Sequence, residues 1–185
     1  SGSYPTSYIP TTTSAVTRVA ETASGAGDAS TFNDSEGVLM AEISALADDQ
    51  TYRAITISDG TDANRVQLEF DLVSNRLNTF IAVSNSAQVN INYTFSDITE
   101  NNKIALKYKT NDFSLFVNGF EVWIDNSGIT YPINTLDVID LSETSLTSNF
   151  YGNTKQIQYF DSALNDSDLE KITSWTSFTD LANGQ

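Results

Sequence analysis

The stretch Gly152–Trp175, GNTKQIQYFDSALNDSDLEKITSW, decides the fold because it joins a strand directly to a helix start. The segment Lys155–Phe160 has the alternation that predicts a β-strand, and Asp161–Ala163 predicts a bend. The residues that follow, Asn165–Trp175, form the one segment of the chain with the pattern of a helix of any length. We therefore expect a strand near the end of the chain that leads into a short C-terminal helix.

Two sequence signals mark the start of this helix. Leu164 and Leu169 occupy the two positions of a hydrophobic staple. Asn165 can cap the free amides of the first turn, and Asp168 stands three residues further on, as in a capping box. Together they place the first turn of the helix directly after Asn165.

A second local signal lies in DFSLFVNGFEVWI, where Asn118-Gly119 separates two alternating runs. Asn-Gly is the preferred pair for a two-residue type I′ turn, because both positions need a positive φ. The alternation predicts that Phe113, Leu115 and Val117 face inward. The same pattern before the hairpin turns Ile104, Leu106 and Tyr108 inward and leaves Lys103, Lys107 and Lys109 outside.

From Ser35 onward, alternating runs recur about every 8 to 12 residues, with turn residues between them, which is typical of a β-sandwich. The runs are SEGVLMAEISAL, YRAITISDG, NRVQLEFDL, RLNTFIAV, VNINYTF, KIALKYK, the two arms of the hairpin, TLDVIDL and KQIQYF. We expect an all-β fold: a two-sheet antiparallel jelly-roll sandwich with one short C-terminal helix.

The hairpin and the closing strand, tyrosine (Tyr159) and acidic helix resemble the signature of laminin-G-like, concanavalin A-like lectin-type jelly rolls. The segment PTSYIPTTTSAVTRVAE resembles a linker of phage and bacterial multidomain proteins, with Glu21 where an aspartate is usual. The resemblance implies that residues 1–24 are the end of a preceding module and an interdomain linker, and that residues 25–185 are the jelly roll. Ser1–Ser3 are interpreted separately as a cloning scar. It also implies a non-catalytic carbohydrate-binding module of a larger phage tail or bacterial surface protein, located on the virion or outside the cell.

The amino-acid composition limits the classes of binding partner that we expect for this chain. Twenty-four acidic residues against nine basic ones give a formal charge of −15, which argues against nucleic acid, anionic membranes and uronate-rich polymers. No run approaches the roughly 18 apolar residues of a membrane span, so we expect no membrane insertion. Cysteine and histidine are absent, which removes disulfides, thiol nucleophiles and the usual zinc sites. The expected partners are a glycan or polysaccharide and the neighbouring domains of a longer chain.

Sugar recognition favours an exposed aromatic platform with a polar rim. Strict alternation in the hairpin places Val122 with Leu115 and turns Trp123 to the opposite face with Phe116, so Trp123 is the expected platform. The alternative is that the helix or the N-terminal segment also covers this face, so that Trp123 belongs to a second-layer core. The other expected sugar-binding residues are Glu121, Phe116, Asp125, Asn126, Tyr131 and Tyr52.

Calcium is a candidate cofactor, because laminin-G-like relatives often hold one ion. Calcium takes six to eight oxygen ligands, and the loop around Gly60 offers Asp59, Asp62 and Asn64. Asp28 and Asp34 form a second acidic group. The relatives often have an aspartate near the start of the final strand, where this chain has Gln156.

Two other functions stay open at this stage. A jelly-roll glycoside hydrolase needs paired carboxylates on one strand face. Glu69 and Asp71 are the nearest match, although a solvent-facing strand edge also explains them. Jelly-roll polysaccharide lyases resemble one another in an arginine-rich strand and a histidine or tyrosine base. This chain has no histidine and no such strand, so catalysis is not expected. The remaining alternative is a structural spacer domain of a virion protein that binds no ligand.

Overall fold

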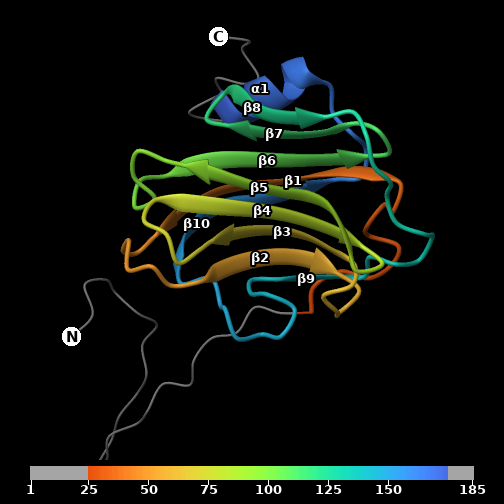
Figure 1. Ribbon diagram of the computed structural model, residues 1–185, viewed down its shortest axis with the longest axis horizontal. Helices are drawn as coiled ribbons and strands as arrows, with labels where there is room; N and C mark the ends of the chain where they lie inside the picture. Colours follow the sequence, from red (N-terminus) through yellow and green to blue (C-terminus); the bar gives the residue numbers. More distant parts are fainter. Residues whose placement is uncertain (1–24, 175–185) are drawn as a thin grey trace, which may run out of the picture.

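The computed structural model describes residues 25–174. They form two five-stranded sheets that pack face to face, with every strand pair antiparallel (Figure 1). The β3 sheet, named for its central strand, has the order β5-β4-β3-β2-β9, and the β6 sheet has the order β10-β1-β6-β7-β8. The strands are β1 (Glu36–Ala45), β2 (Arg53–Ser58), β3 (Arg65–Phe70), β4 (Arg76–Val83), β5 (Ser86–Thr94), β6 (Asn102–Lys109), β7 (Phe113–Val117), β8 (Phe120–Asp125), β9 (Val138–Asp140) and β10 (Gly152–Phe160). The predicted all-β sandwich is confirmed.

The core between the sheets follows the predicted alternation. All six inward-facing residues expected on β6 and β7 are buried in the main core: Ile104, Leu106, Tyr108, Phe113, Leu115 and Val117. Lys107 lies on the outer face as expected, but it is only 4% exposed. Its ammonium Nζ lies 2.6 Å from Asp112 Oδ1 and 3.3 Å from Asp166 Oδ1, so nearby carboxylates compensate the buried charge.

The hairpin turn forms as the sequence predicts. Asn118 and Gly119 have φ values of 49° and 87°, the two positive angles of a type I′ turn. Asn118 also fastens the turn to the neighbouring strand, because its Oδ1 accepts a hydrogen bond of 2.9 Å from the Lys103 amide.

The single helix of the described residues, α1 (Asp166–Ser174), covers part of the outer face of the β6 sheet (Figure 1). Asn165 Oδ1 accepts from the Asp168 amide at 3.0 Å, and Asn165 Nδ2 donates to Asp168 Oδ2 at 2.7 Å. Leu164 and Leu169 pack in a second small core with Val38, Met40, Ala105 and Phe116. The N-cap and the staple are therefore confirmed, whereas Asp168 accepts from the Asn165 side chain and not from the backbone amide that a capping box uses. The two leucines of the staple anchor the helix to the sheet.

Tyr159, the tyrosine of the closing strand, connects three segments of the sandwich. Its hydroxyl oxygen accepts from the Asn33 amide at 2.7 Å and lies 3.0 Å from the Tyr108 hydroxyl. The two rings thus tie β10, β6 and the segment before β1 together across one end of the sandwich.

The proposed linker at residues 1–24, Trp175 and the C-terminal tail lie outside the described residues. Within residues 25–174, no helix has the length and apolar character needed to cross a membrane.

Candidate functional site

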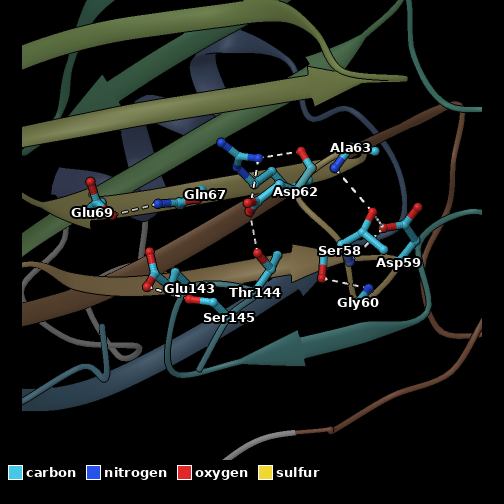
Figure 2. A network of polar contacts seen from close by, with 12 residues as sticks. Ser58, Asp59, Gly60, Asp62, Ala63, Gln67, Glu69, Glu143, Thr144 and Ser145 are labelled. Carbon is cyan, nitrogen blue, oxygen red and sulfur yellow. Dashed lines mark hydrogen bonds and ion pairs between the residues drawn. The ribbon is translucent and has the colours of Figure 1, made fainter. Parts of the chain in front are cut away.

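An open hollow of about 360 Å³ lies on the outer face of the β3 sheet. Its lining is polar except for two aromatic rings, and it comprises Tyr52, Asp62, Arg65, Gln67, Glu69, Asn78, Phe80 and Glu143. Figure 2 shows Gln67 and Glu69 on β3 beside Glu143, which comes from the chain after β9. The hollow thus combines residues that are far apart in the sequence.

Strand register explains how the floor of the hollow is assembled. On β3, Val66, Leu68 and Phe70 are buried in the main core, so Arg65, Gln67 and Glu69 project from the opposite face. On β4, Phe80 pairs with Gln67 and Asn78 pairs with Glu69. Cross-strand partners share a face, and the floor is therefore a small grid of polar side chains around one phenyl ring.

Arg65 and Phe80 form a stacked pair in this grid. The guanidinium carbon of Arg65 lies 4.6 Å from the centroid of the Phe80 ring, a cation–π arrangement. Arg65 Nη1 also lies 3.2 Å from Asp62 Oδ1 and donates to the Asp62 carbonyl oxygen. Asp62 in turn accepts from the Thr144 hydroxyl, as Figure 2 shows, which joins the loop after β2 to the loop after β9.

Two carboxyl groups in the hollow have pKa values displaced in opposite directions. Burial raises the pKa of Glu69 from 4.5 to about 7, and the negative charges of Glu143 and Asp71 add to the effect. Hydrogen bonds from the Ser145 and Thr147 hydroxyls lower the pKa of Glu143, the former at 2.6 Å. Gln67 Nε2 donates to Glu69 Oε2 at 2.8 Å. At neutral pH the Glu69 carboxyl is therefore protonated in part of the molecules, where it can donate a hydrogen bond, and ionised in the rest, where it can only accept. The Glu143 carboxylate is ionised and only accepts hydrogen bonds.

A row of asparagine amides continues the polar grid onto β5. Asn78 Nδ2 donates to Asn90 Oδ1 at 3.0 Å and to Asn92 Oδ1 at 3.1 Å. Asn90 and Asn92 are both exposed. Their remaining amide groups are open to a ligand that extends beyond the hollow.

Two buried polar atoms on this face are unsatisfied. Thr56 Oγ1 and Arg65 Nε have no hydrogen-bond partner among the described residues. Thr56 pairs with Gln67 across β2 and β3, so its side chain belongs to the same face as the hollow. Unpaired buried groups are uncommon in folded proteins and often mark places where a water or a ligand group binds.

The expected outward orientation of Trp123 is wrong. The pairing of β7 with β8 shifts between Leu115 and Phe116, so that Leu115 pairs with Trp123 and Phe116 with Glu121. Val122 is the extra residue of this bulge, and both Val122 and Trp123 pack against the main core. The bulge therefore places Trp123 on the same side as Leu115, against the main core and not in the second-layer core of the alternative.

The other sugar-site candidates are scattered. Phe116 is 3% exposed beneath α1, and Tyr131 is 5% exposed with its hydroxyl donating to the Arg65 carbonyl oxygen at 2.8 Å. Glu121 and Asn126 are exposed on and after β8, and Asp125 Oδ1 accepts from the Ser127 amide and hydroxyl. Of the whole set, Tyr52 alone lines the hollow, and 42% of it is exposed.

The two candidate calcium groups are held by hydrogen bonds within the protein. Asp59 accepts from the Thr61 amide and hydroxyl and from Asn64 Nδ2. Asp28 accepts from Ser30 and Thr31, and buried Asp34 accepts from the Thr135 and Leu136 amides. Within residues 25–174, no group of three or more acidic residues is arranged to hold a metal ion. Calcium binding stays a prediction.

The two catalytic candidates, Glu69 and Asp71, have different surroundings in the structure. The interpretation of Glu69 as a residue on a solvent-facing strand edge is wrong, because β3 is a central strand and Glu69 is 9% exposed. Asp71 follows β3 and pairs with Arg76 at 2.7 Å between Oδ2 and Nε, which commits it to the loop before β4.

Sequence reasoning missed Arg65, Gln67, Asn78, Phe80 and Glu143. One signal for Phe80 was present: in RLNTFIAV it occupies the polar phase, between inward-facing residues. An aromatic residue on the polar face of a strand is a reason to expect a binding surface. No local pattern marks Glu143, because the loop after β9 reaches the hollow only in the folded chain.

No protein-family model matches the chain, and no curated protein matches it. Solved structures do match in fold. One is the CBM40 domain of the Ruminococcus gnavus IT-sialidase bound to α2,3-sialyllactose, with a TM-score of 0.63 at 14% identity, covering 82% of this chain and 94% of that chain. A second is domain 4 of a GH43 extracellular arabinanase from Geobacillus stearothermophilus in complex with arabinotriose, with a TM-score of 0.60 at 9% identity, covering 80% of this chain and 70% of that chain. A third is the SAP-like pentraxin of Limulus polyphemus, with a TM-score of 0.59 at 12% identity, covering 77% and 71% of the two chains. The fold is thus a concanavalin A-like β-sandwich.

Proposed function

We propose that this protein is a non-catalytic carbohydrate-binding module that holds a glycan in the hollow of the β3 sheet. The observation that carries the proposal is the lining of the hollow. A partly exposed Tyr52 ring stands beside Gln67, Glu69 and Asn78, which offer hydrogen-bond donors and acceptors on one face. This pairing of an apolar plane with polar groups matches the flat C–H faces and hydroxyl rim of a sugar ring. Similarity in fold to domains solved with sialyllactose and arabinotriose supports the proposal.

The hollow is open to solvent, and we expect a single site to bind a glycan weakly, in about the millimolar to micromolar range. Several copies on one particle or polymer would raise the apparent affinity through effective concentration. This fits the proposal that the domain belongs to a longer phage tail or bacterial surface protein, located on the virion or outside the cell. The resemblance of the N-terminal segment to interdomain linkers supports that setting.

The test compares two tyrosine variants in a glycan array and in affinity gel electrophoresis. Tyr52→Ala removes an exposed ring from the hollow, and we expect at least about a tenfold loss of glycan affinity. Tyr151→Ala is the matched control, because Tyr151 is 60% exposed and is not among the residues that line the hollow. Equal binding by both variants and the parent protein would refute the site. Absence of any glycan binding by the folded protein would favour the structural-spacer function.

The same screen includes a chelator arm for calcium. The proposed binding mode uses the side chains of the hollow and no metal, while Asp59, Asp62 and Asn64 stay the predicted calcium ligands. Loss of glycan retention under chelator, restored by added calcium, would place a metal ion beside the site.

A glycoside hydrolase is the second candidate function, because the pKa values of Glu69 and Glu143 are displaced in opposite directions within one hollow. Such a division is the pattern of a proton donor paired with a carboxylate that stays ionised. Release of new reducing ends from a bound polysaccharide, abolished by Glu69→Gln, would support catalysis. Binding without release in the parent protein would rule it out for that polysaccharide.

A further inference from the structure

The charges that line the hollow are unbalanced. Asp62, Glu69 and Glu143 contribute carboxyl groups, and Arg65 contributes the one cationic side chain among the lining residues. The guanidinium is partly engaged, since its Nη1 contacts Asp62 and its central carbon lies over the Phe80 ring, while its Nε is buried without a partner among the described residues. The chain as a whole carries a formal charge of −15, so no distant positive surplus offsets this arrangement.

An anionic sugar would need a binding site with free hydrogen-bond donors for its carboxylate. Proteins recognise a carboxylate through a free guanidinium or several convergent N–H donors, which form charge-assisted hydrogen bonds. Here a carboxylate that approached Arg65 would enter a hollow that is also lined by the carboxyl groups of Asp62, Glu69 and Glu143. Glu69 and Glu143 both line the hollow, and the charge of Glu143 adds to the effect of burial on the pKa of Glu69, so a further anion here would meet like charges.

The same groups suit hydroxyls and amides that carry no charge. Glu143 accepts a hydrogen bond, and Glu69 can donate or accept according to its protonation state. Gln67 adds an amide, and Asn78 leads to the exposed amides on β5. None of these contacts requires a second negative charge.

We infer that the hollow selects uncharged glycans and excludes sialylated and uronate-containing ones. The inference rests on the proposed function and specifies its ligand class. It separates this chain from the similarly folded CBM40 domain that was solved with sialyllactose. The excluding groups are Glu69 and Glu143, acting together against any further anion.

The experiment uses the full chain and paired ligands at about pH 7.5. The pairs are lactose with α2,3-sialyllactose, and neutral arabinan with polygalacturonate, within an array of matched neutral and sialylated glycans. We expect retention of neutral members only, with each anionic counterpart bound at least about tenfold more weakly, since like charges across an interface oppose binding. Glu69→Gln and Glu143→Gln keep the shape of the hollow and should reduce this difference in affinity between neutral and anionic ligands, which we call the affinity gap. Glu121→Gln, exposed on β8, is the control and should leave the affinity gap unchanged.

The outcomes distinguish the inference from the proposed function. Retention of an anionic glycan in preference to its neutral partner, lost in Tyr52→Ala, would overturn the inference while supporting the site. An affinity gap that Glu69→Gln and Glu143→Gln leave intact would overturn the assignment of exclusion to these two residues. Retention of no glycan of either class would overturn both.

Discussion

Glu69 should make the stability of this protein depend on pH in a way that one substitution removes. Its carboxyl group has a pKa raised from 4.5 to about 7 in the folded chain. Between these pH values the folded chain holds a proton that the unfolded chain has released. The free energy of unfolding therefore falls as the pH rises through this window, and it is flat with respect to this group below and above it.

The size of the effect follows from the displacement. A shift from 4.5 to about 7 corresponds to about 3 kcal/mol at roughly 1.4 kcal/mol per pKa unit. The hollow is open to water, which screens the neighbouring charges, so we expect about half of that value. Glu69→Gln removes the titration and keeps an oxygen that can accept from Gln67. At about pH 8 the variant should be more stable than the parent by about 1.5 kcal/mol, and at about pH 4 the two should be equal.

Urea unfolding at a series of pH values between about 4 and 8 measures this difference. At each pH, the free energy of unfolding of the parent is subtracted from that of the variant. This difference removes the contributions of the other carboxyl groups, apart from those that interact with Glu69. Glu121→Gln makes the same chemical change at an exposed site on β8 and should reproduce the parent curve. Parallel curves for the parent and Glu69→Gln would refute the reasoning, because they would mean that Glu69 titrates alike in the folded and unfolded chains.

Two further predictions concern the β6 sheet. Trp123→Ala should cost about 2–3 kcal/mol of stability, because the ring packs against the main core. Glycan binding by the folded variant should stay within about twofold of the parent, because Trp123 is not among the residues that line the hollow. Lost binding with unchanged unfolding would contradict this. Asn165→Ala should cost about 1 kcal/mol in denaturant unfolding through the lost N-cap. Asn126→Ala, at an exposed position after β8, is its control and should change stability by less than about 0.5 kcal/mol.

The sequence alone determined the features whose cause is local. Asn118-Gly119 forms its turn because these two residues tolerate positive φ. Asn165 caps α1 because its side chain reaches the Asp168 amide within the same turn. The six alternating residues of β6 and β7 face the core because strand geometry has a period of two. Each of these results depends on residues a few positions apart.

Tertiary structure decided the placement of the candidate site. A single extra residue at Val122 turned Trp123 from the outer face to the core, and no local pattern in the hairpin marks that bulge. The hollow is lined by Tyr52, Asp62, Glu143 and residues of β3 and β4. These side chains come together only when β3 pairs with β4 and the loop after β9 packs beside them. The pKa of Glu69 likewise depends on burial and on charges that arrive from other segments. Local chemistry shapes each strand, turn and cap, whereas register and loop packing determine which side chains share a face.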